Sequence, residues 1–62
     1  MDDASRLTVL HETSRILSHA QAIQKQLQRE VPDRGYMLTH AISIQESIPL
    51  LVEQLKRWDS TE

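Results

Sequence analysis

Cysteine is absent from this sequence of 62 residues, and glycine occurs only once. Without cysteine no disulfide is available, and the three histidines are not joined by further ligands into a metal-binding cluster. A single glycine excludes a glycine-rich loop of the kind that cradles a phosphate group. A lone chain this short buries only about 60% of its unfolded surface, so we expect its stability to depend on association.

Aromatic residues and long apolar runs are also scarce. Aromatic residues make up 3% of the chain, which leaves few side chains to stack on nucleic-acid bases. No apolar run approaches the roughly 20 residues of a membrane span, and the opening Met-Asp-Asp lacks the segments of a secretory signal. Seven basic and nine acidic residues give a net charge of −2, which indicates no polyanionic partner. We expect a cytoplasmic protein without membrane contact.

A helical repeat runs through residues 37–58. Its apolar residues are spaced alternately four and three apart, as in a helix that packs lengthwise against another helix. Few charges interrupt this segment, since Glu46 and His40 are the only side chains expected to be charged between residues 35 and 52. The predicted bundle seam of this helix comprises Met37, Ala41, Ile44, Ile48, Leu51, Leu55 and Trp58.

The same alternation in the first half of the chain predicts a second helix with its own seam. Leu10 and Leu17 lie one position beyond the repeat and widen the apolar stripe to three positions per heptad. A stripe of this width is typical of a helix that touches two neighbours in a bundle. The predicted bundle seam of this helix comprises Val9, Ile16, Leu17, Ala20, Ile23 and Leu27, with Thr13 in the same line.

The helical pattern breaks over residues 31–35, where proline, aspartate and glycine cluster. Proline disfavours helical geometry at the residue before it, and aspartate and glycine are turn residues. We predict a first helix over about residues 3–30, a turn over 31–35 and a second helix over about 36–58. So short a connection makes neighbouring helices antiparallel, and residues 1–62 then form a single helical-hairpin domain.

Pro49 lies inside the second predicted helix, where proline removes a backbone hydrogen bond and costs about 3 kcal/mol. The four-three spacing nevertheless keeps one register across it, from Ile48 to Leu51. We therefore predict one helix that is kinked near Pro49. The alternative is a short third helix capped by Ser47.

Two helices packed side by side cannot cover apolar faces that are three positions wide, because each helix leaves one flank in water. The predicted fold is therefore all-α, an antiparallel helical hairpin that dimerises into a four-helix bundle. The expected partner is a second copy of the chain, since self-complementary dimers are the commonest soluble oligomers. A different protein that completes the bundle is the alternative.

A second apolar line runs beside the seam of the second helix, and we call it the outer line. Two interpretations of the outer line stay open. It is either the wide flank that the homodimer buries, or a surface that binds a different protein. The outer line comprises Leu38, Ile42, Pro49 and Val52.

The three histidines give little support for a metal or catalytic site. His11 and His19 are eight residues apart, which separates them by about 80° around a helix with 100° per residue. Reflection of the chain through a turn near Asp33 places His40 opposite Gln26 and away from His19. No serine, histidine and carboxylate converge, so we expect neither enzyme activity nor a cofactor.

Basic residues form a strip on the outer side of the first predicted helix. Arg15, Lys25 and Arg29 belong to it, while Glu12 and Glu30 lie at its ends. Such a strip can follow the phosphates of a nucleic acid. The negative net charge and the scarcity of aromatic residues argue against this use.

The predicted function is that of a non-enzymatic protein–protein interaction module. We expect a small dimeric regulator, inhibitor or adaptor that acts by binding another protein, because the chain is short and carries no recognisable chemistry. The alternative is an RNA-binding hairpin dimer that uses the basic strip on its first helix.

Overall fold

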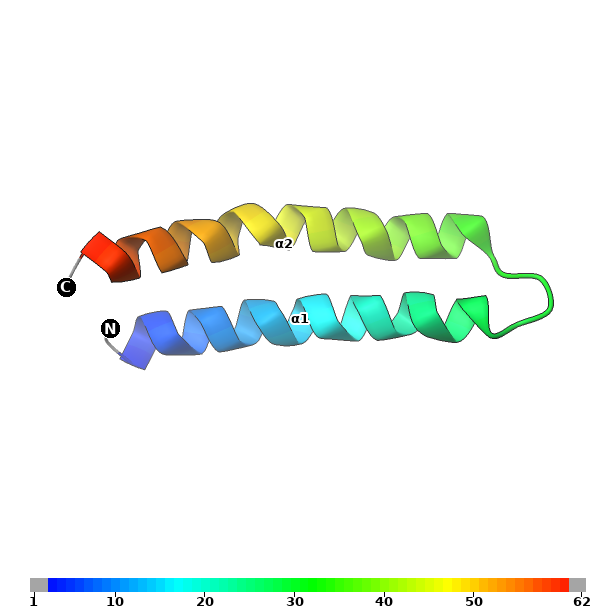
Figure 1. The fold of residues 1–62 in the computed structure, drawn as a ribbon, viewed down its shortest axis with the longest axis horizontal. Coiled ribbons are helices and arrows are strands. Elements are labelled where there is room, and N and C mark those ends of the chain that lie inside the picture. The colour runs from blue at the N-terminus through cyan, green and yellow to red at the C-terminus, as the bar shows by residue number, and fades with distance from the viewer. Residues whose placement is uncertain (1–2, 61–62) are drawn as a thin grey trace.

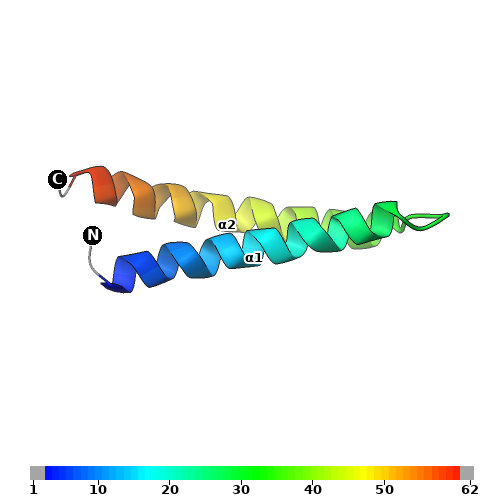
Figure 2. The ribbon, with the colours of Figure 1, turned by 60° about the horizontal axis from the view of Figure 1, so that its bottom comes forward.

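The computed structural model describes residues 3–60 of the chain, and the side chains of residues 3–58. Two long helices, α1 (Asp3–Leu27) and α2 (Arg34–Ser60), run antiparallel and are joined by a turn at residues 28–33 (Figure 1). The chain is therefore an all-α helical hairpin, with extents of 49 × 16 × 13 Å. Figure 2 shows that the helices cross at a shallow angle.

The turn lies earlier in the sequence than predicted. The first helix ends at Leu27 and not near residue 30, because backbone amides 28 and 29 bond to the carbonyls three residues before them, which tightens the last turn. Asp33 then caps α2, since its Oδ1 accepts a hydrogen bond of 3.0 Å from the Tyr36 amide. The Asp33 amide donates in turn to Gln26 Oε1 at 3.1 Å, which ties the turn to the end of α1.

Replacing Asp33 with alanine is expected to lower the free energy of unfolding by about 1 kcal/mol, the usual cost of losing an N-cap. Urea unfolding followed by circular dichroism measures this change. Asp33→Asn is the matched control, because its side-chain oxygen can still accept the Tyr36 amide hydrogen. Equal loss in both variants would contradict the assignment of Asp33 as the cap.

Helix α2 continues through Pro49 as a single helix (Figure 1). Ser47 lies within this helix, so no helix boundary occurs there and the alternative of a third helix is wrong. The preserved spacing on both sides of Pro49 had favoured continuity. The size of the predicted kink stays a prediction.

The contact between the helices contains no fully buried apolar side chain. Within residues 3–58 the only buried side chains are those of Glu12 and Ser47, and both are polar. The large apolar residues of the two helices are at most half-buried, and the half-buried ones are Val9, Ile16, Ile23, Met37, Ile44 and Leu51. The hairpin alone therefore lacks a dry hydrophobic core, although 39% of its residues are apolar.

Candidate functional site

A line of polar residues runs along the contact between α1 and α2, and we call it the polar seam. Its members recur every seven residues on each helix, as one position of a heptad does. All of them are half-buried or buried, so this line shares the contact with the half-buried apolar residues of the two helices. The polar seam comprises Ser5, Glu12, His19, Gln26, His40, Ser47 and Gln54.

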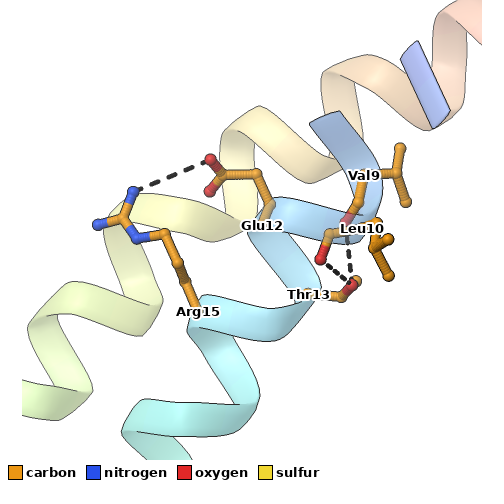
Figure 3. A network of polar contacts seen from close by, with 5 residues as sticks. All are labelled: Val9, Leu10, Glu12, Thr13 and Arg15. Atoms are coloured by element: carbon orange, nitrogen blue, oxygen red, sulfur yellow. Dashed lines mark hydrogen bonds and ion pairs between the residues drawn. The ribbon is translucent and has the colours of Figure 1, made fainter. Parts of the chain in front are cut away.

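Glu12 is the least accommodated member of the polar seam. It is 6% exposed, and its Oε2 is buried without a hydrogen-bond partner. Figure 3 shows its carboxylate beside α2, with the Arg15 guanidinium directed toward it. The Arg15 Nη1 atom is 3.9 Å from Glu12 Oε1, at the long limit of an ion pair. Burial removes water from the carboxylate, and no hydrogen bond to Oε2 replaces the lost hydration. Glu12 therefore destabilises the isolated hairpin.

Two histidines meet in the middle of the polar seam. His19 Nδ1 lies 2.7 Å from His40 Nδ1, and the two ring centroids are 4.9 Å apart. Tyr36 lies beside this pair, and its ring packs against the His40 ring at a centroid distance of 4.5 Å. The prediction that His40 lies opposite Gln26 is therefore wrong, because the turn is centred near residue 30 and not at Asp33.

The polar seam was visible in the sequence as a seven-residue repeat. Sequence reasoning missed it because it followed only the apolar residues, and it treated Glu12 as the end of a basic strip. Within the described residues, no group of three or more histidine, cysteine, aspartate or glutamate side chains is placed to hold a metal ion.

The predicted bundle seam divides into two sets in the structure. Val9, Ile16, Ala20, Ile23, Met37, Ile44 and Leu51 are half-buried. The other members are exposed, and they are Leu17, Leu27, Ala41, Ile48, Leu55 and Trp58. Several of these are large side chains, with exposed fractions of 62% for Leu27 and 43% for Ile48. The seam as a dimer contact stays a prediction.

Both helices turn their apolar stripe to the same side of the hairpin. Most large apolar residues lie four or eight residues after a member of the polar seam, which is a rotation of about 40° or 80° around the helix. Val9 and Ile44 are examples at four residues, and Leu27 and Ile48 at eight. Because the helices are antiparallel, equal rotations away from the contact lead to one common face. We call this the apolar face, and its large members are Val9, Leu10, Ile16, Leu17, Ile23, Leu27, Met37, Ile44, Ile48, Leu51, Leu55 and Trp58.

The outer line on α2 is exposed as well. Leu38 is 55% exposed, Ile42 45% and Val52 42%, and Pro49 is also exposed. Leu38 and Val52 border the apolar face, one position beyond Met37 and Leu51. Ile42 lies farther round the helix, about 120° from Ile48 at 100° per residue.

The basic strip is less continuous than the sequence suggested. Arg15 and Lys25 are exposed on α1, but Arg29 lies in the turn beyond the end of that helix. Arg15 is also directed toward Glu12 (Figure 3). The structure therefore does not align the three basic side chains along one helix.

Two further observations bear on function. No helix within the described residues is long and apolar enough to cross a membrane. Comparison with protein families, with curated proteins and with solved structures found no match to this chain.

Proposed function

We propose that this hairpin is a non-enzymatic protein–protein interaction module that pairs with a second copy of itself through the apolar face. The observation that carries the proposal is the absence of any buried apolar side chain within residues 3–58, beside many large apolar side chains that are exposed. Burial of apolar area is the main force that stabilises folds, at about 25 cal/mol per Å². A second hairpin on the apolar face would supply the core that one hairpin lacks.

The size of the hairpin fits this assembly. A rectangle of 49 × 16 Å, the two longest extents of the rod, covers about 780 Å². Stable interfaces bury on the order of 800 Å² on each partner. A two-fold axis normal to the apolar face would bring identical surfaces together and form a four-helix bundle with a shared core.

The concentration dependence of folding tests the dimer. We expect sedimentation equilibrium to give twice the chain mass of 7.2 kDa at micromolar concentration. Helix content should fall on dilution, because folding and assembly are coupled when the separate hairpin is only marginally stable. A fully helical species that keeps the mass of one chain at micromolar concentration would refute the proposal.

Action on another protein, as a regulator, inhibitor or adaptor, would use the outer line. Pairing through the apolar face leaves Ile42 and Pro49 on the outside of the bundle, where two-fold symmetry presents them twice. Contiguous exposed apolar patches mark interaction sites, and Ile42 and Pro49 would supply the apolar part of such a patch. Ile42→Asp would then preserve the dimer and abolish binding of the second protein.

A further inference from the structure

The histidine pair sits in the contact between the helices and has no part in the proposed dimer. His19 is on α1 and His40 is on α2, and both are half-buried. Their Nδ1 atoms, 2.7 Å apart, form a side chain to side chain hydrogen bond that links the two helices. The protonation of these rings therefore bears directly on whether the helices stay together.

The geometry sets how many protons the pair can hold. In the neutral pair one Nδ1–H donates to the lone pair of the other Nδ1, so the two rings are different tautomers. A first added proton binds Nε2 of the donor ring, which keeps the bond and makes it charge-assisted. A second added proton must bind the acceptor Nδ1, and the bond is then lost because both Nδ1 atoms carry hydrogen.

Within residues 3–58 no carboxylate forms a hydrogen bond or ion pair with His19 or His40 that would offset the resulting repulsion. On α1 the next titratable seam residue is Glu12, seven residues away or about 10 Å along the helix, and it is directed toward Arg15. On α2 the neighbour is Tyr36, which contacts His40 through its ring, and Asp33 is engaged in capping. Two cationic rings with centroids 4.9 Å apart therefore repel each other in a partly desolvated contact.

We propose that His19 and His40 form a proton-operated clasp, which holds α1 against α2 with one or no added proton and releases them when the second binds. Histidine is the side chain that ordinarily changes charge between about pH 5 and 8, so release falls in mildly acidic solution. Stability is present at neutral pH and is lost as the pH falls. Because the clasp acts within one hairpin, the inference goes beyond the proposed dimer.

Thermal unfolding between pH 7.5 and 4.5 tests the clasp. The wild-type Tm is expected to fall by on the order of 5–10 °C more than that of His19→Gln or His40→Gln. Glutamine cannot become charged, and its amide oxygen can accept a hydrogen bond from the remaining protonated ring. His11→Gln is the matched control, because His11 is exposed on α1 away from the pair, and its acid loss should equal that of the wild type.

The difference between pH values, and not the stability at one pH, is the decisive quantity. Equal acid loss in the wild type and in both seam variants would overturn the proposal, as would a flattened profile in His11→Gln. If the seam variants fail to fold, NMR contacts between α1 and α2 in the wild type carry the test. These contacts should be lost in mildly acidic solution. Contacts between the helices that persist to pH 4.5 would overturn the proposal.

Discussion

Replacing Ile48 with aspartate is expected to abolish assembly and to reduce helix content sharply at micromolar concentration. Ile48 lies midway along α2 on the apolar face and is 43% exposed in the separate hairpin. The hairpin therefore tolerates the new carboxylate, whereas a dimer through this face would bury it without a partner. An uncompensated buried charge costs about 3–5 kcal/mol per site, and two-fold symmetry applies the cost twice. Sedimentation velocity and circular dichroism at matched concentrations measure the result.

Ile42→Asp is the matched control, because Ile42 is exposed to a similar degree, 45%, on a different side of the same helix. This variant changes charge and residue type in the same way and should leave the dimer intact. The reverse outcome, in which Ile42→Asp dissociates the protein and Ile48→Asp does not, would assign the dimer contact to the outer line. If both variants still assemble, pairing through α2 is refuted.

Replacing Glu12 with leucine is expected to raise the free energy of unfolding by about 1–3 kcal/mol. The carboxylate is buried, its Oε2 has no hydrogen-bond partner, and its only cation is 3.9 Å away. An apolar side chain of similar size removes the cost of dehydration and adds burial. Urea unfolding at one fixed protein concentration gives the change, since the stability of an assembling protein depends on concentration.

Arg15→Ala separates the carboxylate from its ion pair. Because the pair is long and the arginine is about half exposed, we expect a change within about 0.5 kcal/mol and unchanged assembly. A less stable Glu12→Leu variant would contradict the cost assigned to the buried carboxylate. Comparison of Glu12→Leu with Arg15→Ala therefore separates the effect of the buried carboxylate on stability from the effect of its ion pair.

The polar seam suggests why the hairpin keeps groups that lower its stability. A buried polar residue at a heptad position can select one register over others at a cost in stability. In this hairpin the His19–His40 bond forms only when those two residues lie side by side. An apolar residue at either position would pack equally well one heptad away.

The elements of this fold follow from sequence pattern alone. The four-three spacing predicted two helices, and proline, aspartate and glycine predicted the turn between them, because these signals act over a few neighbouring residues. The short connection then required the antiparallel hairpin. The exposure of Ile48 and Leu55 also agrees with an apolar stripe too wide for one neighbour.

Two features depended on how the helices pack. A repeat gives the angles between side chains on one helix, but it does not say which lines point at the neighbouring helix, and here the polar line is one of them. A seven-residue repeat also matches itself after a shift of one heptad. Because α1 ends at Leu27, the centre of the turn lies about half a heptad earlier in the chain than predicted. Each residue of α2 therefore faces a residue of α1 that is one whole heptad earlier than predicted. His40 thus meets His19 instead of Gln26, because the turn selects among registers that the repeat leaves equivalent.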